Sequence, residues 1–160
     1  MKIVLATGGF DPLHSGHISY LKSARELGDK LIVGLNSDDW LTRKKGRPFM
    51  PYKERAAVVG NLKMVDHVMD FNDNEDHATD AIFKIYNKLM PDDILVFANG
   101  GDRTATNIPE MDCYQNSTNV RFVFGIGGDD KKNSSSWILE EWKDPKTVRN
   151  WGWYRVLDDK

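Results

Sequence analysis

Cysteine is nearly absent from this sequence, and so are long apolar segments. The single cysteine, Cys113, cannot form an internal disulfide, which is typical of a protein from a reducing compartment. No apolar run approaches the ~20 residues that a membrane-spanning helix needs, and residues 1–10 lack the pattern of a secretory signal peptide. We therefore expect a cytoplasmic protein that does not interact with a membrane.

An excess of charge of one sign, internal repeats and low-complexity tracts are also missing. The 22 basic and 24 acidic residues give a formal net charge of −2, which does not favour binding to nucleic acid. Apolar residues make up 40% of the 160 residues, enough for the core of one domain without disulfides or structural metals. These absences predict one globular domain with room for a short extension.

What the sequence does contain is an alternation of short apolar segments with segments of helical periodicity. We expect strands at residues 2–7, 31–35, 65–71, 94–98 and 120–125. We expect helices at residues 15–27, 38–42, 51–65, 78–89 and 134–142. Ser15 is the expected N-cap of the first helix, and residues 43–47 are expected to form a basic loop. The alternation predicts an α/β fold: a Rossmann-like, open, parallel five-stranded sheet with helices on both faces.

The C-terminal end of the chain is rich in aromatic residues. We assign residues 1–142 to the domain and residues 143–160 to an aromatic C-terminal tail, part of which has the pattern of a strand. So many aromatic side chains should be covered by something. The tail is expected to pack on its own domain, to begin a further domain, or to act as the dimerisation arm of a homodimer.

Loops that follow the strands mark the expected ligand site. In an open α/β sheet, ligands bind at the carboxyl ends of the strands. Three of these loops carry glycine or polar residues, at Gly8, at Asn36 and at Gly100. We therefore expect these three loops to converge on one site.

The stretch from Gly8 to His17, GGFDPLHSGH, carries the most chemistry. Glycines after a strand let backbone N–H groups approach phosphate oxygens, and the following helix directs its positive end at the same place. His14 and His17 are three residues apart at the helix start, so both can face one ligand and stabilise charge on a phosphoryl group. A two-histidine metal site ranks lower, because Asp11 is the only further ligand nearby in sequence.

This stretch resembles the signature of the HxGH nucleotidyltransferase superfamily, in its cytidylyltransferase-like group. The similarity runs from Lys2 to about Leu139 and is strongest to glycerol-3-phosphate cytidylyltransferase and to the adenylyltransferase domain that acts on heptose 1-phosphate. The resemblance implies catalytic roles for His14 and His17, which would contact the phosphates of a nucleoside triphosphate (NTP).

The resemblance also implies roles for residues outside the motif. A lysine after the second strand would neutralise the polyphosphate; Lys44 matches best, with Lys45 and Arg47 as alternatives. The phosphorylated acceptor would be held by Asp11, which could instead hold the metal, and by Arg55. Nucleotide-binding positions would be Gly8, Gly9, Phe10, Gly100, Asp102, Ser134, Ser135 and Ser136.

Several of these residues also have a purely structural interpretation. The serines at residues 134–136 could simply cap a helix, and Arg103 is a further candidate for contact with phosphate. His67 is expected to be structural, His77 to be exposed at a helix start, and Cys113 to have no catalytic role.

The expected reaction is transfer of a nucleotidyl group from a Mg²⁺-bound NTP to a phosphorylated small molecule, with release of pyrophosphate. The segment from Gly8 to Arg55 matches the glycerol-phosphate enzymes without a gap, and this resemblance slightly favours CMP transfer from CTP to an acceptor such as glycerol 3-phosphate. The stretch before Ser134 lacks the arginine of the glycerol-phosphate enzymes, which leaves adenylyl transfer from ATP to a sugar 1-phosphate as the alternative. A non-catalytic nucleotide-binding regulatory subunit is an alternative of another class.

Overall fold

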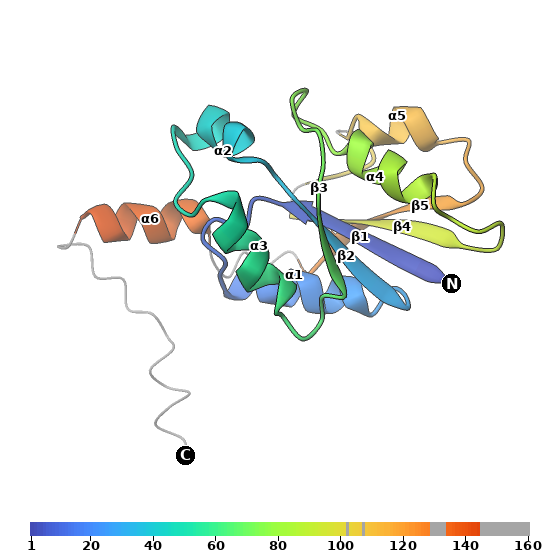
Figure 1. The fold of residues 1–160 in the computed structure, drawn as a ribbon, viewed down its shortest axis with the longest axis horizontal. Coiled ribbons are helices and arrows are strands. Elements are labelled where there is room, and N and C mark those ends of the chain that lie inside the picture. The colour runs from blue at the N-terminus through green and yellow to red at the C-terminus, as the bar shows by residue number, and fades with distance from the viewer. Residues whose placement is uncertain (102, 107, 129–133, 145–160) are drawn as a thin grey trace, which may run out of the picture.

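The computed structural model describes residues 1–101, 103–106, 108–128 and 134–144. Within these ranges, five strands form one parallel sheet in the order β3-β2-β1-β4-β5. The strands are β1 (Lys2–Gly8), β2 (Lys30–Leu35), β3 (His67–Asp70), β4 (Ile94–Gly100) and β5 (Val120–Ile126). This sheet confirms the predicted Rossmann-like α/β fold (Figure 1).

Helices cover both faces of the sheet, as predicted. The helices of the described residues are α1 (Ser15–Arg25), α2 (Asp38–Lys45), α3 (Tyr52–Gly60), α4 (Thr79–Tyr86), α5 (Glu110–Tyr114) and α6 (Ser135–Lys143). In Figure 1, α1 and α3 lie on one face, α4 and α5 lie on the other, and α2 and α6 lie toward the ends of the strands. The chain winds outward from β1 to β3 and then crosses back to β4, so a crevice between the loops is expected beside β1 and β4.

Strand β1 contributes side chains to the hydrophobic cores on both sides of the sheet, because its successive side chains point to opposite faces. Val4 and Ala6 are fully buried in the core that also contains Leu21 of α1. Leu5, between them, is fully buried in the core that contains Ile82 of α4. A strand buried on both faces has an almost continuous apolar sequence, and it holds the loop that follows it rigidly in place.

Some boundaries differ from the sequence prediction. α2 continues through Lys45, so the predicted basic loop is largely the last turn of a helix, where cations interact favourably with the helix dipole. α3 ends at Gly60 rather than near residue 65. The helix α5 has no counterpart in the prediction, because five residues are too few to reveal a helical period.

Two sets of predicted features lie outside the described residues. They are Asp102 and residues 145–160, which make up most of the aromatic tail. At the last described helix, the ring of Trp142 in α6 lies 6.3 Å from the ring of Phe49. None of the helices in the described ranges is both long enough and apolar enough to span a membrane.

Candidate active site

A cleft of about 960 Å³ opens at the carboxyl ends of the strands. Gly8, Asn36 and Gly100 all line it, which confirms that the loops after β1, β2 and β4 converge on one site. The loop after β5 contributes Gly127, and the start of α6 contributes residues 134–136. The sheet therefore gathers the predicted phosphate-binding loops around one space.

His14 and His17 form a reciprocal cap at the start of α1. We predicted Ser15 as the N-cap, but the structure places His14 there. Nδ1 of His14 accepts the N–H of Gly16 at 3.1 Å, and Nδ1 of His17 accepts the N–H of His14 at 3.3 Å. Because Nδ1 is an acceptor in both rings, each neutral ring carries its proton on Nε2. In each ring the N–H donor is thus the nitrogen opposite the one that caps the helix.

The two imidazole rings stack in the cleft, with centroids 3.7 Å apart and planes inclined by 22°. Burial lowers the pKa of His17 to about 3, and electrostatic interactions with His14, Lys45 and Lys44 act in the same direction. His17 is therefore neutral near pH 7. A neutral, oriented N–H donor is better suited to stabilising charge on a phosphoryl oxygen than to transferring a proton.

The turn between β1 and α1 is held in shape by close packing on both sides. A Cβ atom at Gly8 would lie 3.1 Å from the Phe10 ring, and one at Gly9 would lie 3.0 Å from the Leu41 side chain. Phe10 itself has a φ of 49°, which is uncommon for a residue with a Cβ atom. A side chain at either glycine would therefore require the neighbouring side chain to shift by a few tenths of an ångström.

The structure distinguishes the basic residues that follow β2. Lys44 and Lys45 both line the cleft. The Lys44 ammonium lies 4.5 Å from the centre of the Trp40 ring, one helical turn earlier. The Lys45 ammonium lies 3.1 Å from the Asp11 carboxylate and is thereby committed to an ion pair. Arg47 is exposed and does not line the cleft.

Asp11 lines the cleft, and its carboxylate is also held by neighbouring groups of the protein. Its carboxylate is buried and accepts the backbone N–H groups of Phe49 and Met50, each at 2.7 Å. Lys45 balances its charge. The sequence prediction gave Asp11 to the acceptor or the metal; here both oxygens instead hold the segment that leads into α3.

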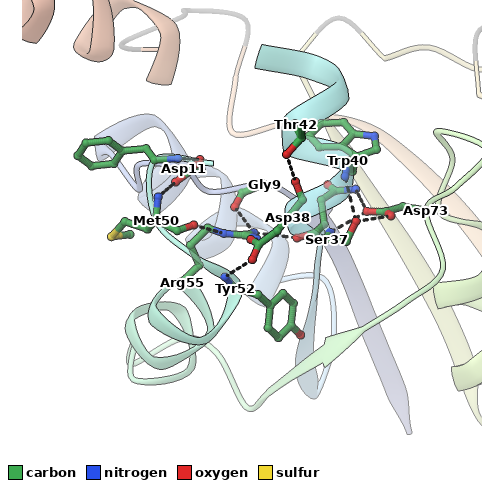
Figure 2. A network of polar contacts seen from close by, with 12 residues as sticks. Gly9, Asp11, Ser37, Asp38, Trp40, Thr42, Met50, Tyr52, Arg55 and Asp73 are labelled. Atoms are coloured by element: carbon green, nitrogen blue, oxygen red, sulfur yellow. Dashed lines mark hydrogen bonds and ion pairs between the residues drawn. The ribbon is translucent and has the colours of Figure 1, made fainter. Parts of the chain in front are cut away.

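Arg55 has a similar position at the centre of a polar network (Figure 2). Its side chain is 0% exposed and does not line the cleft. It donates to the carbonyl oxygens of Gly9 at 3.0 Å, Asn36 at 2.8 Å and Met50 at 3.0 Å, and it pairs with Asp38 at 2.7 Å. We predicted a contact between Arg55 and the acceptor phosphate. In this structure Arg55 instead ties the loops after β1 and β2 to the start of α3.

Asp73, which the sequence analysis did not single out, connects the loop after β3 to the start of α2. Its buried carboxylate accepts from the Ser37 N–H and the Ser37 hydroxyl, both at 2.7 Å, and from the Asn36 amide at 3.1 Å. The Ser37 hydroxyl in turn accepts the Trp40 N–H at 3.0 Å and caps α2. No local sequence pattern reveals such a contact, because its partners lie far apart in the chain.

Glycines on the far side of the cleft pack against α1. A Cβ atom at Gly100 would lie 3.0 Å from the Tyr20 ring. At Gly127, which has a φ of 90°, a Cβ atom would lie 3.0 Å from the Tyr20 Cα. Tyr20 also donates its hydroxyl to Ala98 of β4 at 2.7 Å. This wall of the cleft is therefore built tightly enough that side chains at these glycines would displace it.

The start of α6 is attached to the histidine motif. The hydroxyl of Ser135 donates to the backbone oxygen of Pro12 at 2.9 Å. Ser134 occupies the N-cap position, but its side chain makes no capping hydrogen bond. The alternative in which the Ser134 hydroxyl caps the helix is therefore not supported, although the residue does occupy the N-cap position. The first turn of α6 faces the same cleft as the two histidines.

His77 and Trp40 also line the cleft, although the sequence analysis assigned neither of them to it. α4 begins at Thr79, so His77 lies in the preceding loop, and its side chain is 25% exposed and pairs with Glu75 at 3.0 Å. Across the described parts of the chain, no group of three or more His, Cys, Asp or Glu side chains could hold a metal ion.

Comparison with known proteins agrees with this geometry. The sequence model of the family described as "Cytidylyltransferase-like" matches residues 5–140. The bifunctional protein HldE of Campylobacter concisus is 36% identical over 147 residues, which are 91% of this chain and 28% of that protein. HldE of Erwinia tasmaniensis is 43% identical over an alignment of 122 residues, which covers 68% of this chain and 25% of that protein. The chain thus spans about a quarter of the length of these relatives.

Two solved structures have the same fold. A lipopolysaccharide core biosynthesis protein from Thermoplasma volcanium matches with a TM-score of 0.61 and 28% identity, covering 81% of this chain and 99% of that one. A NadR protein in complex with NR matches with a TM-score of 0.58 and 18% identity, covering 90% of this chain and 40% of that one, a likeness in fold alone. Because the family match covers residues 5–140 and the site lies within that range, this chain belongs to the cytidylyltransferase-like family of nucleotidyltransferases.

Proposed function

We propose that this chain transfers an adenylyl group from ATP to a sugar 1-phosphate, such as heptose 1-phosphate, and releases pyrophosphate. The observation that carries the proposal is the capped histidine pair, whose Nε2 donors stand in a glycine-lined cleft at the strand ends. The choice of substrates is supported by the HldE relatives and by the lipopolysaccharide core biosynthesis protein. These relatives favour adenylyl transfer over the CMP transfer to glycerol 3-phosphate that the spacing of the sequence suggested.

The proposed reaction is an in-line displacement at the α-phosphorus. An oxygen of the acceptor phosphate forms the new bond to phosphorus, and the bond to the bridging oxygen of the β-phosphate breaks. Its electron pair leaves with pyrophosphate. A phosphate is already ionised near pH 7, so the site needs no strong general base, and catalysis consists of positioning and charge stabilisation.

In this mechanism, His14 and His17 donate hydrogen bonds to oxygens on which negative charge grows. Lys44 adds positive charge at the wall of the cleft, and the first turn of α6 favours the β- and γ-phosphates. The remaining nucleotide contacts are assigned to Gly8, Gly9, Phe10, Gly100, Asp102, Ser134, Ser135 and Ser136. Mg²⁺ enters as part of the Mg²⁺–ATP complex.

Asp11 and Arg55 receive a supporting role in this proposal. Both are buried and hydrogen-bonded to backbone groups of the cleft loops. They would affect acceptor binding only by holding these loops in place.

Measurement of pyrophosphate release from each pairing of ATP or CTP with heptose 1-phosphate or glycerol 3-phosphate tests the substrate assignment. We expect the highest kcat/KM for ATP with heptose 1-phosphate. A preference for CTP with glycerol 3-phosphate would replace the proposal by its cytidylyltransferase alternative. Nucleotide binding without turnover for any pairing would favour the regulatory subunit.

We further propose that the chain is a homodimer with the aromatic tail as its arm. The support is the density of aromatic residues in that segment, which need to be covered. Light scattering coupled to size exclusion should give twice the mass of the chain. A shortened chain ending at residue 144 should then be monomeric, and a dimer of that shortened chain would contradict the role of the tail.

A further inference from the structure

Glu110 is a buried acidic residue that the proposed mechanism does not use. It begins α5, and its side chain is 0% exposed. Removing a carboxylate from water is unfavourable unless hydrogen bonds and an opposite charge compensate it. A fully buried glutamate beside the cleft therefore needs a structural explanation.

The contacts of Glu110 join two walls of the cleft. Its Oε1 accepts the N–H of Ala78 at 2.7 Å, and Ala78 lies in the loop that precedes α4 and lines the cleft. The same oxygen lies 3.6 Å from Nη1 of Arg103, in the loop after β4. Oε2 of Glu110 is buried and has no hydrogen-bond partner among the residues that the structure describes. Arg103 thus supplies the positive charge for this carboxylate.

Arg103 stands on the cleft wall itself. It lines the cleft together with Gly100 and Gly101, and its side chain is 40% exposed. The described contacts of its guanidinium, with Asn99 at 3.5 Å and with Glu110, both use Nη1. A guanidinium carries five N–H donors in a planar fork, so anchoring at Nη1 is compatible with donation to a ligand by the other nitrogens.

We propose that Glu110 is a positioning residue that holds the Arg103 guanidinium against the cleft, where it binds phosphate oxygens of the nucleotide. This inference rests on the proposed function, because it requires that the cleft binds an NTP. The buried carboxylate holds Nη1 of the Arg103 guanidinium and leaves the other two nitrogens to donate to the polyphosphate. The hydrogen bond between Glu110 and the Ala78 N–H holds the loop before α4, which also lines the cleft.

The test is a double-mutant cycle on the affinity for Mg²⁺–ATP, measured by calorimetry. Glu110→Gln keeps an oxygen for the Ala78 N–H but loses the charge, and Arg103→Met loses the guanidinium. Each single variant should raise the Kd about tenfold, as expected for loss of a charge-assisted hydrogen bond. The double variant should bind no more weakly than Arg103→Met. Asp112→Asn, which removes an exposed charge from the same helix, is the matched control and should leave the Kd unchanged.

Thermal unfolding of the same variants gives a second readout that does not depend on nucleotide. Arg103→Met leaves the Glu110 carboxylate buried without its cation, so its Tm should fall. Adding Glu110→Gln to Arg103→Met should restore part of that loss. This comparison remains available if Glu110→Gln alone folds poorly.

The outcomes separate the inference from the proposed function. If the native chain binds neither ATP nor CTP, the proposed function fails and the inference fails with it. If the native chain binds nucleotide but Glu110→Gln weakens binding equally with and without Arg103, Glu110 does not act through Arg103. An unchanged Kd in Glu110→Gln would equally overturn the inference and leave the proposed function standing.

Discussion

At the scale of single residues, the start of α1 determines what the two histidines can do. Each Nδ1 accepts a backbone N–H, so the helix cap itself selects the nitrogen that faces a ligand. Burial then keeps His17 neutral. A neutral donor at this position stabilises charge that develops in the transition state and does not exchange a proton with substrate.

His17 should make the protein less stable as the pH falls from about 6.5 toward 3. Its pKa in the folded protein is about 3, against 6.5 for a free imidazole, so the unfolded chain binds more protons in this range. The stability that the neutral ring contributes is complete above pH 6.5 and is lost as the pH falls through the folded pKa. Urea unfolding between pH 7 and pH 4 measures this dependence. His17→Asn should show a shallower slope; an unchanged slope would contradict a buried neutral ring.

Removing the charges of Lys44, Lys45 and Arg47 one at a time should affect activity and stability differently. Lys44→Met should lower kcat/KM for the nucleotide about 100-fold with little change in Tm, because Lys44 lines the cleft. Arg47→Met is the matched control, since Arg47 is exposed and does not line the cleft. Lys45→Met should lower the Tm, because it leaves the buried Asp11 carboxylate without its cation. Equal losses of activity in Lys44→Met and Arg47→Met would contradict this division.

At the scale of elements, buried polar side chains tie the loops of the cleft together. Arg55 joins the loops after β1 and β2 to α3, and Asp73 joins the loop after β3 to α2. Buried hydrogen bonds of this kind depend on direction as well as distance, which apolar packing does not. These contacts therefore fix the loops of the cleft relative to one another.

Arg55→Met should destabilise the protein by about 3 kcal/mol, because it leaves buried backbone oxygens and Asp38 without donors. Arg55→Lys keeps the charge but cannot reach all four acceptors, so its loss should be only slightly smaller. Urea unfolding monitored by circular dichroism measures both. A fully stable Arg55→Lys variant with a raised KM for the acceptor alone would restore the predicted contact between Arg55 and substrate.

Features that depend on neighbouring residues could be predicted from the sequence, and features that depend on distant ones could not. The apolar run of β1 and the turn at Gly8 and Gly9 are local, so the sheet and its ligand edge follow from them. The partners of Arg55 lie 5 to 46 residues away, and nothing in the sequence pairs them. Residues 43–45 were assigned to a loop, so no helix face could separate Lys44 from Lys45.

At the scale of the whole molecule, the order of the strands places the cleft. The chain leaves β1 toward α1 on one face and leaves β4 toward α5 on the other, so the loops diverge beside β1 and β4. The histidine cap, Arg103 and the first turn of α6 all line this opening. These groups come from distant parts of the chain, and the order of the strands brings them to one cleft.

The most direct test of this account follows the phosphorus resonances of ATP and heptose 1-phosphate by ³¹P NMR in the presence of Mg²⁺ and the protein. We predict that the native chain forms an ADP-sugar, which contains the new diphosphate bond, and an equal amount of pyrophosphate. His14→Ala and His17→Ala should each form them about 10²–10³-fold more slowly while retaining the native circular dichroism spectrum. Near-native rates in both variants, or no product from the native chain, would contradict the account.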